Sequence, residues 1–528
     1  MPPMARRILP LLFAILAACG GSGDDPAPTP SPEPPGSPPA TPGVPIPPGQ
    51  IENAIGQLDH LAADIMARTG IPGMAVAVVH DDKVVYARGF GVREVGKAGA
   101  IDADTVFQLA SVSKSIGATV VARQISLGAV RWDTLMLEAL PGFALKDDWV
   151  TQHLTVGDLY AHRSGLPLHA GDDLEDLGYD RAQVLERLRL LPLAPFRGHY
   201  AYTNFGITAA AEAVARRSGL DWATLSEQAL YQPLGMIRTS SRFADFIARD
   251  NRAAPHILTD AGYRPRYQRD PDAQSAAGGV SSSVNDLARW LRLLLAEGEW
   301  QGRSWISPTA LLPAMTPQMI SSQPGAPNER ASNYGYGFNV SVQPSGRTLI
   351  SHSGAFLLGA GTNFALLPSA GVGIVALTNA QPRGAAEAMA QNFLDLVQFG
   401  RITRDWVQAY GDAMAGLYQP LGQFAGQPPP AHPAPPAASG HYVGIYANDY
   451  FGPLEIQLDG DQLWLQAGPA AVRWPLRHWD GDTFMFDLQG ENAPDGSVSA
   501  VWFERSATGA FAVRVEWMDQ YGLGTFRR

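Results

Sequence analysis

The chain has 528 residues, of which 45% are hydrophobic and 17% are charged, and its formal net charge is -11. This length exceeds what one ordinary hydrophobic core holds, so we expect two or more domains joined by linkers. The chain is acidic and has no run of clustered lysines and arginines, which excludes nucleic acid as a partner because phosphate binding needs such a cluster. A single cysteine excludes an internal disulfide and a cysteine-based zinc site.

The first residues have the pattern of a bacterial export signal. Two arginines precede an apolar run over residues 8–18, which is shorter than the roughly 20 residues needed to span a bilayer. The run ends in the sequence LAAC at Cys19, which resembles a lipobox. We therefore expect a signal peptide over residues 1–18 and lipidation of Cys19, with an ordinary signal peptide as the alternative. Glycine rather than aspartate follows Cys19, so the expected location is the periplasmic side of a Gram-negative outer membrane, with the lipid as the only membrane anchor.

Proline, glycine and serine dominate residues 19–49, which hold too few aliphatic side chains to fold and predict an extended tether. A second proline-rich stretch, at residues 427–438, belongs to a helical and proline-rich linker that we place at residues 406–440. These tracts divide the chain into a main domain at residues 50–405 and a C-terminal domain at residues 441–528.

The main domain has the pattern of an α+β fold. Apolar residues recur at helical spacing over residues 51–65, and two strands joined by a turn follow at residues 74–79 and 84–90. Strands at both ends with helices between them predict an antiparallel sheet that joins the two ends of the domain. The further predicted helices lie at residues 111–125, 155–162, 202–218, 286–297 and 384–397, and the further strands at residues 348–352, 363–367 and 372–378.

The C-terminal domain has the pattern of an all-β fold. Short runs of strand-forming residues alternate with turns rich in Gly, Asp and Asn, which predicts a small antiparallel barrel or sandwich. The predicted strands lie at residues 442–446, 454–458, 463–466, 472–476, 483–488, 500–504 and 512–517.

An S-x-x-K sequence, Ser111 to Lys114, follows a strand-like stretch and begins a predicted helix. Positions i and i+3 share a helix face, so the lysine amine can reach the serine hydroxyl. Such a hydroxyl is a poor nucleophile until a base takes its proton, and a lysine can serve if its surroundings lower its pKa from about 10.4. The helix N-terminus also favours a developing oxyanion. The same residues fit a solvated helix face, so this pair alone decides nothing.

Two later short sequences could also contribute catalytic or substrate-binding groups. Tyr202 and Asn204 can supply a proton shuttle and a hydrogen bond to substrate, although they also fit a buried tyrosine and a helix-capping asparagine. A strand that runs through His352 into Gly354 can bind an extended substrate and lend an N–H group to an oxyanion hole, although a lone histidine is more often structural.

In the order S-x-x-K, Y-x-N and H-x-G, the three sequences together resemble the signature of the penicillin-recognising serine hydrolases. These are class C β-lactamases, D-alanyl-D-alanine peptidases, D-aminopeptidases and related esterases. The flanking sequences FQLA, LTVGDL, HRSGLP and AGGVSS are similar too, and the resemblance covers residues 51–399. It implies a β-lactamase/transpeptidase-like domain, with an all-helical part beside the sheet. The C-terminal domain resembles the lipocalin-like β domain attached to many of these hydrolases.

The resemblance implies a role for each residue. Ser111 would be the acylated nucleophile, Lys114 its base, and Tyr202 the group that passes a proton to the leaving group. The N–H groups of Ser111 and Ala355 would form the oxyanion hole. No metal or organic cofactor is implied, and the expected ligand is a small molecule or a peptide. The residues that would bind substrate are Asn204, His352, Ser353, Gly354 and Ala355.

One residue departs from the β-lactamases of this group, because His352 stands where they have lysine. A mostly neutral imidazole offers no fixed cation to a β-lactam carboxylate. We therefore expect a hydrolase that cleaves esters or amides, with D-amino-acid or cell-wall-derived groups among its substrates. The alternatives are a true class C-like β-lactamase and a non-catalytic cell-envelope scaffold lipoprotein. The sequence does not specify an oligomeric state.

Overall fold

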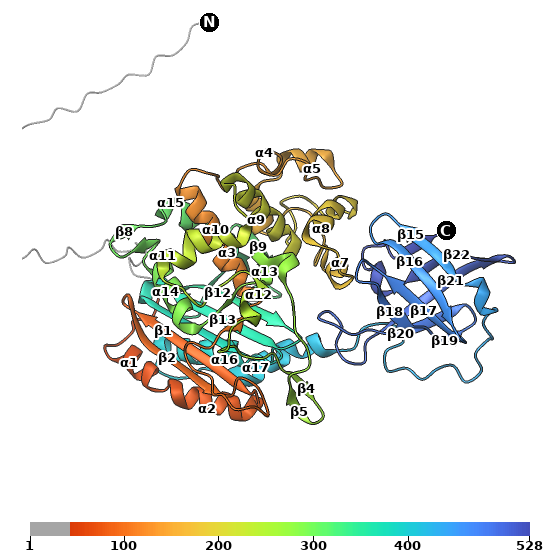
Figure 1. The fold of residues 1–528 in the computed structure, drawn as a ribbon. Helices are drawn as coiled ribbons and strands as arrows, with labels where there is room; N and C mark the ends of the chain where they lie inside the picture. The colour runs from red at the N-terminus through yellow and green to blue at the C-terminus, as the bar shows by residue number, and fades with distance from the viewer. Residues whose placement is uncertain (1–42) are drawn as a thin grey trace, which may run out of the picture. The chain divides into compact units, whose positions relative to one another are not determined.

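An eight-stranded antiparallel sheet forms the centre of the main domain in the computed structural model, which describes residues 43–528 (Figure 1). Its first long strand, β1, pairs with its last, β14, from Met74 opposite Thr378 to His80 opposite Val372. The sheet therefore joins the two ends of the domain, as the sequence predicts. Its strands, in spatial order, are β2 (Lys83–Gly91), β1 (Gly73–His80), β14 (Val372–Thr378), β13 (Ala360–Leu367), β12 (Thr348–Phe356), β11 (Asn339–Val342), β10 (Ser332–Tyr334) and β9 (Met319–Ser322).

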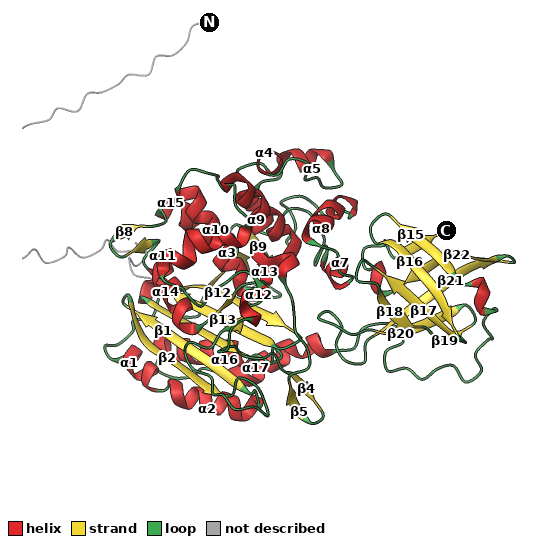
Figure 2. Cartoon of the chain, in the orientation of Figure 1, coloured by secondary structure: helices red, strands yellow, loops and turns green. Residues whose placement is uncertain are grey.

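Helices cover both faces of this sheet (Figure 2). Every residue of β13 and β14 is buried, so neither strand alternates between buried and exposed side chains. The helix predicted over residues 51–65 is broken at Gln57 into α1 and α2. One face is covered by α1 (Gln50–Gly56), α2 (Leu58–Thr69) and α16 (Ala385–Phe399), with α17 (Trp406–Met414) beside them, and the other by α3 (Val112–Ser126) and α14 (Val284–Leu295).

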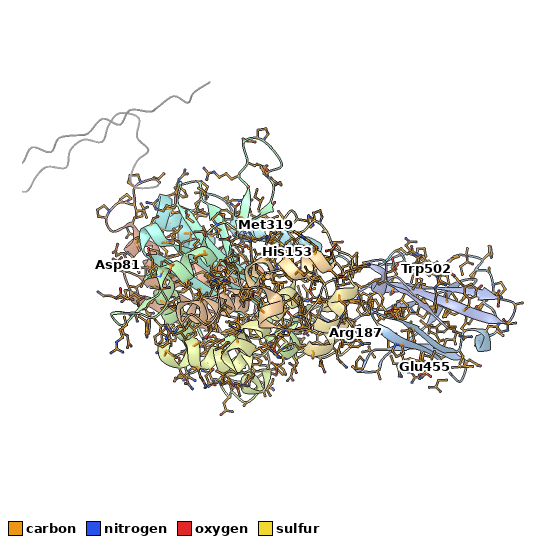
Figure 3. The ribbon with its side chains drawn as sticks, turned by 90° about the horizontal axis from the view of Figure 1, so that it is seen from above. Asp81, His153, Arg187, Met319, Glu455 and Trp502 are labelled. Carbon is orange, nitrogen blue, oxygen red and sulfur yellow. The ribbon has the colours of Figure 1, made fainter. Side chains whose placement is uncertain are left out.

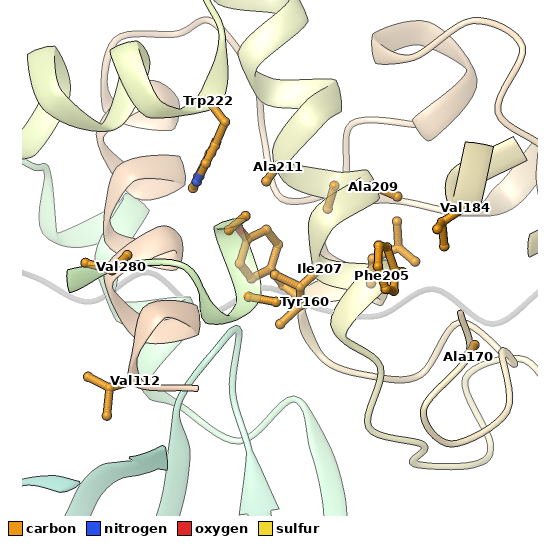
Figure 4. Close-up of a cluster of buried hydrophobic side chains, with 14 of the residues drawn as sticks. Val112, Tyr160, Ala170, Val184, Phe205, Ile207, Ala209, Ala211, Trp222 and Val280 are labelled. Atoms are coloured by element: carbon orange, nitrogen blue, oxygen red, sulfur yellow. The ribbon is translucent and has the colours of Figure 1, made fainter. Parts of the chain in front are cut away.

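The part of the chain between β2 and β9 is mainly helical, and its helices, α3 among them, pack around one apolar core (Figure 4). Tyr160, Phe205, Ile207 and Trp222 are buried in this core together with Val112 at the start of α3. The core fixes α3 against α9, the two helices that begin with the S-x-x-K and Y-x-N sequences. Besides α3 and α14, the helices of this part are α4 (Met136–Ala139), α5 (Asp148–His153), α6 (Val156–Tyr160), α7 (Asp172–Asp176), α8 (Arg181–Arg187), α9 (Asn204–Ser218), α10 (Trp222–Ser226), α11 (Gln232–Leu234), α12 (Phe243–Ile247), α13 (Ser275–Gly278) and α15 (Pro308–Leu311). Three short strand pairs lie among them: β3 (Phe107–Gln108) with β6 (Ser281–Ser282), β4 (Ile257–Thr259) with β5 (Gly262–Arg264), and β7 (Glu299–Trp300) with β8 (Arg303–Ser304).

The C-terminal domain is a nine-stranded antiparallel sheet that nearly closes into a barrel, since its two edge strands are consecutive along the chain. Figure 3 labels Glu455 and Trp502 on this barrel, and Arg187 where the helical part adjoins it. All seven predicted strands are present. The two strands that were not predicted are β19, whose sequence RHWD is mostly polar, and β23, which has three residues. The strands, in spatial order, are β18 (Val472–Pro475), β17 (Gln462–Ala467), β16 (Gly452–Asp459), β15 (Gly444–Asn448), β23 (Thr525–Arg527), β22 (Gly509–Val515), β21 (Val498–Ser506), β20 (Thr483–Asp487) and β19 (Arg477–Asp480).

The two segments expected to be tether and linker make specific contacts where they are described. The backbone N–H of Val44 donates to the Ser345 carbonyl at 2.9 Å, so residues 43–49 lie against the main domain. The backbone N–H of Ala434 donates to Asp480 at 2.6 Å, so the proline-rich linker lies along the barrel. The expected signal peptide and Cys19 lie outside the described residues. Within residues 43–528, no helix is both long and apolar enough to cross a membrane.

Candidate active site

A sharp turn presents Ser111 at the start of α3. The short strand β3 ends two residues before Ala110, whose φ of 47° places it in the left-handed region that non-glycine residues rarely adopt. Ser111 follows as the N-cap of α3, so its backbone N–H has no partner within the helix. The strained Ala110 is buried against Phe356 and Ala360, and this packing offsets a conformational cost of about 1–2 kcal/mol. The serine therefore stands at a helix N-terminus, where partial positive charge gathers.

Lys114 lies one helical turn further on and is completely buried. Its Nζ is 3.1 Å from Ser111 Oγ, 2.7 Å from Asn204 Oδ1 and 3.0 Å from the Ala277 carbonyl oxygen. The two carbonyl oxygens only accept hydrogen bonds, so they take both hydrogens of a neutral amine and leave its lone pair for the Ser111 hydroxyl. Burial lowers the pKa of Lys114 to about 7, and the charge of Asp172 opposes this shift. The amine is therefore arranged as a base.

Tyr202 completes the hydrogen bonding of the nucleophile. Its hydroxyl donates to Ser111 Oγ at 2.7 Å, and its ring centre is 4.5 Å from Lys114 Nζ. Burial raises the pKa of Tyr202 well above its usual value, which keeps the phenol protonated. Ser111 Oγ can thus accept from Tyr202 while it donates to Lys114, and both groups that move protons contact the attacking oxygen.

Asn204 links the base to a carboxylate that the sequence did not mark. Its Oδ1 accepts from Lys114, and its Nδ2 donates to Asp172 Oδ2 at 3.0 Å. His169 Nδ1 lies 3.1 Å from the same Asp172 oxygen. In this structure Asn204 positions Lys114, while its expected contact with the substrate amide stays a prediction.

The open edge of β12 forms the wall opposite Tyr202. Strand β11 pairs with β12 only over residues 348–351, and no strand of the described chain pairs on that side beyond Ser351. Ser353 and Ala355 line the cleft from this edge. Gly354 packs on the nucleophile turn so closely that a Cβ there would overlap the Leu109 carbonyl oxygen and lie 3.0 Å from Ser111 N. The H-x-G glycine is thus required for β12 to approach the nucleophile.

His352 lines the same wall, but both of its ring nitrogens are engaged within the protein. Nδ1 lies 2.6 Å from the Ser353 carbonyl oxygen, which only accepts, so Nδ1 carries the hydrogen. Nε2 then accepts from the Tyr334 hydroxyl at 2.8 Å. Burial lowers the pKa of His352 to about 3, with a further contribution from the charge of Lys114. The low pKa makes His352 neutral, and its ring shapes the wall of the cleft, while its expected contact with substrate stays a prediction.

The cleft that contains Ser111 has a volume of about 700 Å³, and its lining holds more acidic than basic residues. Both domains contribute to its lining, and Asn492, Trp517 and Gln520 come from the C-terminal domain. Arg269 is the only arginine or lysine among the described residues that line it, and it pairs with Glu175 at 2.5 Å. The acidic residues of the lining are Asp172, Asp173, Asp176, Glu387 and Glu491.

The comparison with known families agrees with this geometry. The beta-lactamase family model matches residues 58–398. The chain belongs to the beta-lactamase family. A domain of unknown function, DUF3471, matches residues 428–520.

Relatives of this beta-lactamase family member include several hydrolases. The chain is 25% identical over 465 residues to an unguisins hydrolase of Aspergillus violaceofuscus, covering 78% of this chain and 79% of that protein. It is 26% identical over 292 residues to a D-aminopeptidase of Brucella anthropi, covering 54% of this chain and 52% of that protein. A solved structure, the octameric penicillin-binding protein homologue from Pyrococcus abyssi, has the same fold, with a TM-score of 0.58 and 21% identity over 88% of this chain and 98% of that one. The chain is a serine hydrolase.

Three residues of this beta-lactamase family site escaped prediction from sequence. Asp172 precedes Asn204 by 32 residues and Tyr334 precedes His352 by 18, and neither lies in a recognised spacing. Glu491 belongs to the other domain and follows Leu357 by 134 residues. No signal in the sequence singles these residues out, because folding alone brings them to the site.

Proposed function

We propose that this chain hydrolyses ester or amide bonds of uncharged or amine-bearing small molecules and peptides through an acyl-Ser111 intermediate. Substrates with D-configured or cell-wall-derived groups are included. The observation that carries the proposal is the arrangement of Lys114, whose hydrogens are taken by Asn204 and Ala277 so that its lone pair faces Ser111 Oγ. A scaffold that only binds would gain nothing from a buried lysine with a pKa of about 7 beside a serine.

In the acylation step, Ser111 Oγ attacks the substrate carbonyl carbon while its proton moves to Lys114 Nζ. The oxyanion receives hydrogen bonds from the backbone N–H groups of Ser111 and Ala355. As the bond to the leaving group breaks, the leaving alcohol or amine takes the phenolic proton of Tyr202, and the proton held by Lys114 restores the phenol. Water then attacks the acyl carbon while Lys114 takes a proton from it, and that proton passes to Ser111 Oγ as the bond between Oγ and the acyl group breaks, which releases the acid and regenerates Ser111 and neutral Lys114.

The charge of the cleft supports the proposed substrate class. Burial raises the pKa of Asp176 to about 6, of Asp173 and Glu387 to about 7, and of Glu491 to about 8. The lining therefore gains most of its negative charge above neutral pH and then repels a carboxylate, and its single guanidinium, Arg269, is already paired with Glu175. His352 adds no positive charge, because burial keeps it neutral. A β-lactam carboxylate therefore lacks the partner that a lysine at position 352 would give it. An amine meets a favourable field, and the similarity to a D-aminopeptidase is consistent with such a substrate.

We further propose that the enzyme is an exported lipoprotein of a Gram-negative outer membrane. The basic residues, apolar run and LAAC sequence that end at Cys19 support this location. The proline-rich segment that follows would let the enzyme stand away from the lipid surface.

A matched pair of substrates tests the charge preference. D-alanine p-nitroanilide carries an amine, and its succinylated form carries a carboxylate on the same scissile amide. Burial raises the pKa of Asp173 to about 7, so the assay is run at pH 8, where its carboxylate is mostly ionised. We expect a higher kcat/KM for the amine, a smaller preference in Asp173→Asn, and no change in the exposed control Asp260→Asn. A preference for the succinylated substrate would contradict the proposed class, as would nitrocefin hydrolysis as efficient as that of p-nitrophenyl butyrate.

A further inference from the structure

Two consecutive residues of the C-terminal domain hold the two walls of the catalytic cleft. Glu491 and Asn492 lie in the segment between β20 and β21, and both line the cleft that contains Ser111. Glu491 contacts the turn between β12 and β13, and Asn492 contacts α7. The segment therefore bridges parts of the main domain that are far apart in sequence.

The contact of Glu491 is specific in geometry. One carboxyl oxygen accepts the backbone N–H of Leu357 at 2.7 Å, and the other accepts the backbone N–H of Leu358 at 3.2 Å. These amides follow directly after the end of β12 at Phe356, and Leu357 is two residues beyond Ala355, the expected oxyanion donor. Two adjacent backbone N–H groups that donate to the two oxygens of one carboxyl group fix the turn in position and orientation, because hydrogen bonds are directional and apolar contacts are not.

The contact of Asn492 lies on the opposite wall. Its Nδ2 donates to Asp176 Oδ2 at 2.9 Å, and the nearby Tyr450 hydroxyl of the barrel donates to Asp173 Oδ1 at 2.8 Å. Helix α7 also carries Asp172, which holds the amide of Asn204 and through it Lys114. Hydrogen bonds therefore connect the barrel to Lys114 through α7, and to the segment that follows Ala355 through the β12–β13 turn.

We propose that Glu491 is a positioning residue for catalysis, and that its carboxyl group sets the Ala355 amide relative to Ser111. The C-terminal domain is then part of the catalytic apparatus and not only a packing domain. This inference rests on the proposed hydrolase function. The hydrogen bonds of Glu491 are not needed merely to hold the two domains together. Tyr179 already donates to the Phe451 carbonyl at 2.6 Å, and Tyr521 donates to the Leu168 carbonyl at 2.7 Å.

The test compares Glu491→Gln and Glu491→Ala with the exposed barrel control Glu504→Gln in the full-length enzyme. Glutamine keeps the size of the side chain but turns a donor toward one of the two amides. We measure kcat and KM for p-nitrophenyl butyrate per active site, counted with a fluorophosphonate. We expect kcat to fall about tenfold in Glu491→Gln and further in Glu491→Ala, with KM changed less than about twofold, since a displaced oxyanion donor weakens the transition state more than substrate binding. Glu491→Asp, which keeps the carboxyl group, should recover part of the loss.

Hydrogen exchange provides a readout that does not depend on turnover. The amides of Leu357 and Leu358 should exchange slowly in the wild type and faster in Glu491→Gln. An unchanged kcat per active site, with only a lower melting temperature, would overturn the inference, and so would unchanged exchange at residues 357–358. A wild type that fails to react with ester or fluorophosphonate would instead refute the proposed function, while the exchange measurement would still decide whether Glu491 positions the turn.

Discussion

The protonation of Lys114 should govern the pH dependence of acylation. Only the neutral amine can take the Ser111 proton, and burial lowers the pKa of Lys114 to about 7. With that pKa, the neutral fraction is about one half at pH 7, about one tenth at pH 6 and about one hundredth at pH 5. A lysine with its usual pKa near 10.4 would be neutral in only roughly one molecule in 2,500 at pH 7. The structure therefore predicts that kcat/KM rises about tenfold per pH unit up to about pH 7 and then levels off.

Asp172→Asn should move this profile in a defined direction. The charge of Asp172 favours the ammonium form and raises the pKa of Lys114, so its removal should lower that pKa and shift the rising limb to lower pH. Asparagine still offers an oxygen to Asn204, which keeps the local geometry. The assay is kcat/KM for p-nitrophenyl butyrate between pH 5 and 9, corrected for spontaneous hydrolysis, with exposed Asp260→Asn as the control. A flat wild-type profile, or a limb that rises beyond pH 9, would refute the assignment of Lys114 as the base.

Three further changes have defined outcomes. Gly354→Ala should reduce kcat/KM for esters by about a hundredfold or more, because its methyl group would push β12 away from Ser111 N; activity near the wild-type level, measured per active site, would show that the close approach is not needed. His352→Lys should speed acylation by nitrocefin, measured by stopped flow, because it supplies a cation for the carboxylate, and no gain would remove our explanation of the substrate preference. Mass spectrometry of the membrane-extracted protein should find a diacylglyceryl group at Cys19, and an unmodified N-terminus beyond that residue would contradict the lipid anchor.

Two kinds of feature could be predicted from the sequence. Some are fixed by local geometry, and the others follow from the joint resemblance of three short motifs to a family signature. A helix places Lys114 one turn from Ser111 whatever the rest of the fold does, and this pair is found at 3.1 Å. The sheet that joins both ends of the main domain followed from the order of strands and helices, and β1 and β14 do pair.

The remaining parts depend on contacts between distant segments. Nothing near Asn204 in the sequence shows that its amide is shared between Lys114 and Asp172. The hydrogen bond from Tyr334 that occupies His352 is equally invisible in a strand pattern. Glu491 looks like an ordinary loop carboxylate until the barrel places it on the turn after β12. The roles of these residues depend on partners that are distant in sequence, so neither the periodicity of the sequence nor the spacing of its motifs predicts them.

Acylation of Ser111 is the most direct test of the account. The purified enzyme is mixed with an excess of p-nitrophenyl butyrate or a fluorophosphonate, quenched in acid and analysed by mass spectrometry of the intact protein and its peptides. The structure predicts one adduct, on the peptide that contains Ser111, lost in Ser111→Ala while the melting temperature stays within a few degrees of the wild type. An adduct on another residue, or ester turnover that persists in Ser111→Ala, would contradict the proposed mechanism.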